Sequence, residues 1–275
     1  MAPIRELAPA KVNLVLRIGP LAANGLHEVC SLFASLDLAD VVEVEPAPED
    51  SVECEGVDGP NLAAAAIERL RQYAPSMPPM RVRIKKLIPV AAGLAGGSAD
   101  AAAAMRAANS FHELPFDDDH LREIAAPLGS DVPSQIVPAH AVVTGTGQRV
   151  DRVDLPRMPV VLVPAATGLS TADVFRKAES MGLMREQLDP LDLYALAGET
   201  PATIGARLEN DLQAATLRLR PELQGAIDQL HGAGALGAQV SGSGPTVFGL
   251  FADLATAEAA AAEFLHAVVT MVASR

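Results

Sequence analysis

The chain has 275 residues, more than one hydrophobic core usually holds, so we expect two domains or one large one. Apolar residues make up 49% of the sequence and charged residues 20%, which excludes a disordered or fibrous chain. The formal net charge of −13 disfavours a general binder of nucleic acids or anionic membranes, and any anionic ligand then needs a local positive site.

The first part of the chain alternates predicted strands with a helix. Residues 12–18 alternate apolar and polar side chains, which predicts a strand with Lys11 and Asn13 together on its polar face. A later strand carries Lys86 on the same face as its apolar residues. The elements expected here are strands over residues 12–18, 40–46 and 82–88, and a helix that Asn61 opens and that ends near Tyr73.

The last of these strands leads into a glycine-rich segment, PVAAGLAGGSADAA at residues 89–102. Its glycines let the backbone approach a phosphate, and the first amides of the next helix, expected from about Ser98 to Asn109, favour an anion. We expect Ser98 to cap that helix. The segment lacks the Gly-Lys-Ser/Thr of a Walker A loop, and Ala95 breaks a G-x-G-x-x-G pattern. A plain strand-to-helix turn is the alternative interpretation.

The middle of the chain contains a loop aspartate and a predicted hairpin. Helical spacing over residues 121–128 stops before Gly129, which leaves Asp131 in a loop. Such an aspartate is more often a turn or cap residue than a catalytic base. Alternation around Gly145–Gly147 predicts a hairpin, and the polar segment after it is typical of a join. We therefore expect domains over residues 1–153 and 154–275.

The second half has two glycine-rich segments, which we interpret differently. Residues 232–237 match G-x-G-x-x-G, but a helix precedes them and a strand follows, the reverse of a dinucleotide site, so we expect a helix stop. Residues 242–244 lie between two apolar strands and suit either a ligand loop or a plain hairpin. The expected elements are a strand at 159–164, helices at 171–179, 202–218 and 223–230, and then strand, loop, strand and helix.

Cysteine usage and the ends of the chain predict a cytoplasmic protein. Cys30 and Cys54 have no metal-type partner nearby in the sequence, so we expect structural thiols in a reducing compartment and infer no disulfide. The N-terminus has no export pattern. The apolar stretch 259–273 is broken by Glu263 and His266 and is too short to span a bilayer.

Three motifs in order, PAKVN at 9–13, the segment at 89–102 and VSGSGPTVFGLF at 240–251, resemble the signatures of the GHMP small-molecule kinases. Shorter segments are similar to the members that act on a cytidine diphosphate substrate: GLHE at 25–28, GSDVP at 129–133, STADVF at 170–175 and NDL at 210–212. The resemblance covers nearly the whole chain. It implies an α+β fold with a ribosomal-protein-like α/β N-terminal domain, a ferredoxin-like α+β C-terminal domain and an active site in the cleft between them.

The resemblance further implies ATP-dependent phosphorylation of the 2-hydroxyl of 4-(cytidine 5′-diphospho)-2-C-methyl-D-erythritol, in the non-mevalonate isoprenoid route. Asp131 is then the base, and Lys11 keeps it ionised and offsets charge on the transferring group. The resemblance places ATP at Asn61, Lys86, Pro89, Ala91, Ala92, Gly93, Leu94, Ala95, Gly96, Gly97 and Ser98. It places the acceptor at Asn13, Leu26, His27, Thr171, Phe175, Gly242 and Ser243. We expect Mg²⁺ to be held by phosphates and water, with no protein ligand.

The sequence departs from the family pattern at three positions. Leu26 stands where a tyrosine is usual, so we expect one-sided stacking on Phe175 and weaker cytosine binding. Ala95 replaces a usual glycine, which is acceptable only if its φ is negative. Gly96 stands where some members have a serine that binds Mg²⁺.

Other functions stay open at the sequence level. The alternatives are a sister GHMP kinase acting on homoserine, a sugar or mevalonate, a non-catalytic binding module, and a nicotinamide-dependent oxidoreductase that uses residues 232–237. An RNA binder is disfavoured by the charge of −13 and by aromatic residues at only 3%. The expected partner is a small molecule, with no nucleic acid and no membrane, and the oligomeric state is left open.

Overall fold

The computed structural model describes residues 3–55 and 61–274, and the chain forms two compact units. Neither unit is one continuous stretch. Unit 1 comprises Met1–Ala10, Leu38–Val90 and Ala95–Pro138, and unit 2 comprises Lys11–Asp37, Ala91–Leu94 and Ala139–Arg275. The domain boundary expected near residue 153 stays a prediction.

Two long strands contribute to both units. β1 (Ile4–Leu21) and β2 (His27–Pro46) contain the strands expected at 12–18 and 40–46, but each extends well beyond them. Their interiors are buried on both faces, so the alternation of apolar and polar residues that marks a half-exposed strand is weak there. The sequence pattern therefore identified only a part of each strand.

Unit 1 contains a parallel strand pair joined by a helix. β3 (Ser51–Cys54) pairs in parallel with β4 (Met80–Lys85), which pairs antiparallel with the end of β2. The connecting helix α1 (Leu62–Tyr73) begins where expected, because the Asn61 side chain accepts a hydrogen bond from the amide of Ala63.

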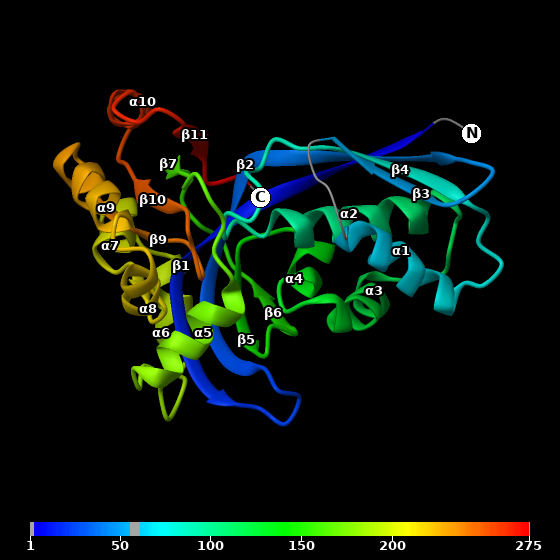
Figure 1. Cartoon of the computed structure of the whole chain (residues 1–275), viewed down its shortest axis with the longest axis horizontal. Helices are drawn as coiled ribbons and strands as arrows, with labels where there is room; N and C mark the ends of the chain where they lie inside the picture. The colour runs from blue at the N-terminus through cyan, green and yellow to red at the C-terminus, as the bar shows by residue number, and fades with distance from the viewer. Residues whose placement is uncertain (1–2, 56–60, 275) are drawn as a thin grey trace. The chain divides into compact units, whose positions relative to one another are not determined.

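The remaining helices of unit 1 pack with α1 on one side of these strands (Figure 1). They are α2 (Gly96–Phe111), α3 (Asp118–Ala125), the 3-10 turn η1 (Ala126–Leu128) and α4 (Val132–Ile136). α2 is rich in buried alanines, whose small side chains let α1 and α4 approach closely. This packing fixes the helix that follows the glycine-rich loop.

Unit 2 contains a hairpin and a four-stranded antiparallel sheet. β5 (Ala141–Gly145) and β6 (Arg149–Arg152) form the hairpin expected around residue 146. The sheet has the order β11-β7-β10-β9, built from β7 (Pro159–Val163), β9 (Gly237–Val240), β10 (Val247–Leu250) and β11 (Val268–Met271). With α9 (Leu223–Gly232) and α10 (Leu254–Ala261) packed on it, this is the ferredoxin-like arrangement that the resemblance implied.

The segment between β7 and α9 differs from the sequence prediction. α5 (Thr171–Ser180) is confirmed, but α6 (Leu191–Ala197) was not expected, and neither was β11 at the C-terminal end. The single helix expected at 202–218 is wrong, because α7 (Pro201–Ala206), β8 (Glu209–Asn210) and α8 (Gln213–Leu219) replace it. The helix breaks so that β8 can pair in parallel with β1.

Two smaller expectations concern the cysteines and the apolar stretches. Cys30 and Cys54 are free thiols in the described chain, and burial raises the pKa of Cys30 to about 11, which makes it a poor nucleophile at neutral pH. Within residues 3–55 and 61–274, no helix is long and apolar enough to cross a membrane.

Candidate active site

The three motifs of the sequence meet inside unit 2. The amide of Lys11 donates to the carbonyl of Leu94 at 3.1 Å, which joins the first motif to the second. The hydroxyl of Ser241 donates to the carbonyl of Gly93 at 3.0 Å, which joins the second to the third. Segments far apart in the sequence are thus joined by hydrogen bonds to backbone carbonyls of the glycine-rich segment.

Glycine is required at the closest of these approaches. A Cβ on Gly93 would lie 2.6 Å from the carbonyl oxygen of Ser241 and 2.7 Å from that of Gly244. Gly93 also has a φ of +77°, a conformation that other residues adopt only with strain. The turn at 242–244 is therefore packed against the glycine-rich loop through its backbone, and a plain hairpin does not account for this contact.

Lys11 is held by a chain of buried hydrogen bonds in unit 2. Its ammonium donates to Oδ1 of Asn13 at 2.8 Å and lies 4.3 Å from the ring centroid of Phe33. The amide nitrogen of Asn13 donates to the hydroxyl of Ser31 at 2.8 Å, and that hydroxyl donates to the carbonyl of Val15. Because Ser31 fixes which end of the Asn13 amide faces Lys11, the polar face expected on β1 acts as one network.

Asn13 was expected to contact the acceptor, but its side chain forms hydrogen bonds with other residues of the protein. Both ends of its amide are used inside the protein, by Lys11 and by Ser31. Its backbone carbonyl accepts a hydrogen bond from Gln239, a buried residue of β9. Asn13 therefore orients Lys11, and its role toward the acceptor stays a prediction.

The glycine-rich loop carries backbone strain at two alanines. Ala91 has a φ of +52° and Ala95 a φ of +58°. The condition set for alanine at position 95, a negative φ, is therefore not met, and the cost of a left-handed alanine is about 1–2 kcal/mol. Strain of this kind is retained where the surrounding structure imposes it, often at functional sites.

The helix after the loop begins earlier than expected. α2 starts at Gly96, with Ala95 at its cap position and no side-chain cap seen in the described structure. The expected Ser98 cap is wrong, because Ser98 lies inside the first turn. Gly96, Gly97 and Ser98 thus present the first amides of a helix of 16 residues, the end that favours an anion.

Lys86 lies between two buried carboxylates in unit 1. Its ammonium pairs with Asp40 and, at 2.6 Å, with Asp100 of α2. The other oxygen of Asp40 accepts the amides of Leu87 and Ile88, which fixes the chain just before the glycine-rich loop. A Cβ on Gly96 would lie 3.3 Å from the Lys86 nitrogen, so this cluster borders the start of α2.

Burial shifts the pKa of one of these carboxylates upward. Burial raises the pKa of Asp100 to about 7, although Lys86 opposes the shift, and the nearby Asp40 adds to it. Asp100 Oδ1 is buried without a hydrogen-bond partner among the described residues, whereas both oxygens of Asp40 are occupied. Burial alone would lower the pKa of Lys86, but the two carboxylates raise it and keep the ammonium charged.

The residues expected around the acceptor form two contacts in unit 2. His27 stacks on Phe175 of α5, with ring centroids 5.5 Å apart and an angle of 27° between the planes. The hydroxyls of Thr171 and Ser243 lie 3.0 Å apart, which joins α5 to the third motif. Leu26 is 47% exposed at the tip of the β1–β2 connection, where it leaves no aromatic wall.

Asp131 occupies the cap position of α4 in unit 1. Its carbonyl accepts a hydrogen bond from the hydroxyl of Ser134, and its side chain is partly exposed. Lys11 belongs to unit 2, and the pairing of these two residues stays a prediction. The side chain of Asn61 caps α1, so its role at the nucleotide also stays a prediction.

Several residues that hold these segments in the two units were given no role from the sequence, although three of them lie within its motifs. They are Ser31, Asp40, Asp100, Asn210 and Ser241. Asn210 donates to the carbonyls of Val240 and Gly242 and so holds the third motif. A polar residue inside an apolar run is a signal, as at Ser31, but the partner of each comes from tertiary contacts alone.

The two halves of the chain match known domains. The GHMP kinases N terminal domain matches residues 61–139, and the GHMP kinases C terminal domain matches residues 193–269. A 4-diphosphocytidyl-2-C-methyl-D-erythritol kinase of Pelotomaculum thermopropionicum is 41% identical over 269 residues, which cover 95% of this chain and 93% of that protein. The chain belongs to the GHMP kinase family.

Other relatives agree with this assignment. A protein of the same name from Rhodococcus jostii is 40% identical over 280 residues, covering 97% of this chain and 90% of its own. The crystal structure of a 4-(cytidine 5′-diphospho)-2C-methyl-D-erythritol kinase matches with a TM-score of 0.80 and 30% identity, covering 98% of this chain and 100% of that one. A homoserine kinase from Cytophaga hutchinsonii, at 17% identity and a TM-score of 0.72, shares the fold, covering 99% of this chain and 95% of its own.

The expected two-domain GHMP kinase fold, with mixed α and β structure, is confirmed. As a GHMP kinase, the chain uses ATP as its phosphate donor. The G-x-G-x-x-G match at 232–237 is the end of α9 and the start of β9, as expected for a helix stop, so the nicotinamide alternative has no site there.

Proposed function

We propose that this GHMP kinase phosphorylates the 2-hydroxyl of 4-(cytidine 5′-diphospho)-2-C-methyl-D-erythritol with ATP. The observation that carries the proposal is the junction in unit 2 where Lys11, Gly93 and Ser241 bring the three motifs together. Relatives named for this activity at about 40% identity over most of the chain support the choice of acceptor.

Phosphoryl transfer asks the protein mainly for alignment and neutralisation of charge. The transition state is loose in most analyses, so a carboxylate of ordinary basicity can take the hydroxyl proton late in the step. We assign that role to Asp131 and assign to Lys11 the stabilisation of charge on the transferring group. The acceptor oxygen bonds to the γ-phosphorus as the bond to the ADP oxygen breaks, and the proton passes to Asp131.

The glycine-rich loop has the features of a phosphate cradle. Gly93 lets the loop pack against the third motif, and the first turn of α2 presents amides with no side-chain cap in the described structure. Gly97 has open space where a Cβ would be, so a phosphate can approach the backbone there. We assign the polyphosphate of ATP to residues 93–98.

The described residues do not form a magnesium site from protein ligands alone. Residues 3–55 and 61–274 contain no group of three His, Cys, Asp or Glu side chains that could hold a metal ion. The orphaned buried oxygen near the loop, Asp100 Oδ1, belongs to a carboxylate already paired with Lys86, whose charge opposes a divalent cation. We propose that Mg²⁺ enters with ATP, held by phosphate oxygens and water.

Replacing the proposed base tests the chemistry. Asp131→Asn should lower kcat roughly 10²–10⁴-fold, the contribution of a positioned proton acceptor, with little change in the KM for ATP. Lys11→Ala should cause a comparable loss, and the double variant should be no worse than the more severe single one. Turnover of Asp131→Asn within a few-fold of wild type, or losses that multiply, contradicts the assignment.

A substrate panel tests the choice of acceptor. We expect ADP release in a coupled assay with the cytidyl substrate and little with mevalonate, homoserine or galactose. A preference for one of these acceptors would make the protein a sister GHMP kinase. Absence of turnover with all of them, despite ATP binding, would favour a non-catalytic binding module.

A further inference from the structure

The ring of His27 is held at both of its nitrogens. Nδ1 lies 2.9 Å from the carbonyl oxygen of Gly19 on β1, and Nε2 lies 2.8 Å from a carboxylate oxygen of Glu179 on α5. The side chain is only 8% exposed. One face of the ring stacks on Phe175. The ring is therefore fixed by contacts from two separate elements of unit 2.

Both partners of the ring nitrogens are hydrogen-bond acceptors. A neutral imidazole has one donor nitrogen and one acceptor nitrogen, so it can satisfy only one of these oxygens. Both oxygens accept a hydrogen bond only when both ring nitrogens carry protons. The negative charge of the Glu179 carboxylate then balances the positive charge of such a ring. Neither nitrogen is then open to a ligand.

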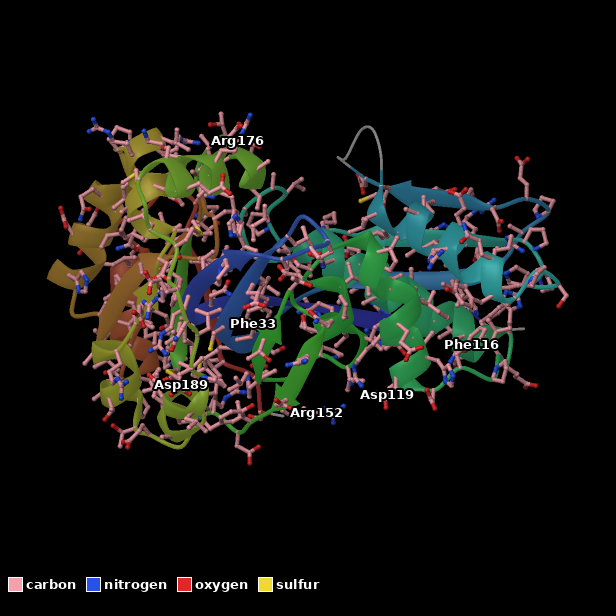
Figure 2. The ribbon with its side chains drawn as sticks, turned by 90° about the horizontal axis from the view of Figure 1, so that it is seen from below. Phe33, Phe116, Asp119, Arg152, Arg176 and Asp189 are labelled. Carbon is pink, nitrogen blue, oxygen red and sulfur yellow. The ribbon has the colours of Figure 1, made fainter. Side chains whose placement is uncertain are left out.

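Glu179 is well placed for this task on α5. It follows Phe175 by four residues, so both side chains lie on the same face of the helix, where they meet His27. The neighbouring charges on the helix are directed elsewhere: Arg176 lies on the outer side of α5 (Figure 2), where it pairs with Asp173. Glu179 is the charged residue of α5 seen bonded to His27 in the described structure.

We propose that Glu179 is a positioning residue of the acceptor site, which holds the His27 ring against Phe175 with both ring nitrogens occupied. The inference rests on the proposed function, which assigns His27 and Phe175 to the cytidyl acceptor. The acceptor then meets a fixed ring and forms no hydrogen bond with a ring nitrogen. Without Glu179, the ring can rotate away from Gly19 and the stacked pair is lost.

Kinetics of Glu179 variants test this role. Glu179→Ala should raise the KM for the cytidyl substrate about tenfold, because a charge-assisted hydrogen bond is lost. The kcat and the KM for ATP should not change. Glu179→Gln keeps an oxygen that can accept from Nε2 and should restore part of the affinity. In the matched control Glu258→Gln, the same charge is lost from an exposed helix residue of α10 that lies in none of the motifs, and the KM should not change.

The outcomes separate the two proposals. If the wild-type protein does not turn over the cytidyl substrate, the proposed function fails, whatever the variants do. If the wild type is active and Glu179→Ala has the same KM for the cytidyl substrate as the wild type, the positioning role is wrong. A loss of thermal stability with both KM values and kcat unchanged would show a purely structural role and also overturn the inference.

A spectroscopic measurement tests the geometry without turnover. In the full-length protein labelled with ¹⁵N at histidine, N–H protons of the His27 ring should exchange slowly with water, because oxygens of Gly19 and Glu179 lie within hydrogen-bond distance of the ring nitrogens. Glu179→Ala should speed exchange at Nε2 and leave the Nδ1 contact with Gly19 in place. A wild-type ring whose N–H protons exchange as fast as those of an exposed histidine would refute the arrangement.

Discussion

Gly93 offers a sharp test of the junction between the glycine-rich loop and the third motif. In Gly93→Ala the new Cβ would lie 2.6 Å from the carbonyl oxygen of Ser241, a rigid backbone atom that cannot turn aside as a side chain would. The left-handed φ of +77° adds about 1–2 kcal/mol, and overpacking adds typically 1–3 kcal/mol. Alanine also lowers the conformational entropy of the unfolded chain, which offsets about 0.4–1 kcal/mol of this destabilisation. We expect a net destabilisation of roughly 1–5 kcal/mol.

The assay is unfolding by heat and by urea, with Gly97→Ala as the matched control in the same loop. A Cβ on Gly97 has nothing within 4 Å, and the residue lies in α2, so stability should be unchanged or up to about 1 kcal/mol higher. Each kcal/mol shifts Tm by about 2–4 °C in a chain of this size, so Gly93→Ala should melt clearly lower. Gly97→Ala should instead raise the KM for ATP, because its Cβ stands where a phosphate approaches. A Gly93→Ala protein within about 0.5 kcal/mol of wild type would refute the close packing, since that is the spread of neutral surface changes.

Two further predictions concern the buried polar groups. Because burial raises the pKa of Asp100 from 3.8 to about 7, the wild type loses stability as pH rises from about 4 through about 7. Asp100→Asn lacks this loss, so its unfolding free energy relative to wild type should rise by roughly 1–4 kcal/mol between about pH 4 and pH 7. Urea titrations at each pH measure this difference, and a difference that does not change with pH would contradict the raised pKa of Asp100. Ser31→Ala removes the partner that orients Asn13 toward Lys11 and should lower kcat about fivefold, the value of one hydrogen bond. Ser35→Ala is the control, since the buried Ser35 hydroxyl has no hydrogen-bond partner among the described residues. Equal kcat values for the two variants would show that Ser31 does not orient Asn13 for catalysis.

Local sequence patterns predicted elements whose signals lie within the element. The helix at 171–180, the hairpin at 141–152 and the Asn61 cap each follow from residues a few positions apart. The broken helix at 202–218 follows from contacts that no local pattern contains. Gly205 packs so closely on Leu236 that a Cβ would lie 2.6 Å away, and residues after it leave the helix to pair with β1.

The candidate site was predictable to the extent that its residues lie in motifs. Lys11, Gly93 and Ser243 were expected from the resemblance, and the structure brings their segments together in unit 2. The groups that hold Asn13 and His27 were not expected, because Ser31 and Glu179 are ordinary strand and helix residues until their partners are known. A supporting side chain carries no motif of its own, since its identity is set by one distant contact.

The charge of the chain shows how the glycine-rich loop attracts an anion in an acidic protein. With a formal net charge of −13, long-range electrostatics oppose a polyphosphate, so the attraction must be local. Lys86 cannot supply it alone, because Asp40 and Asp100 surround its ammonium and leave the ionised cluster with a net charge of −1. A proton on Asp100 makes the cluster neutral, and a bound polyphosphate favours that proton for the same electrostatic reason. Under the proposed function, the favourable local field for the polyphosphate then comes from the amides at the start of α2 more than from Lys86.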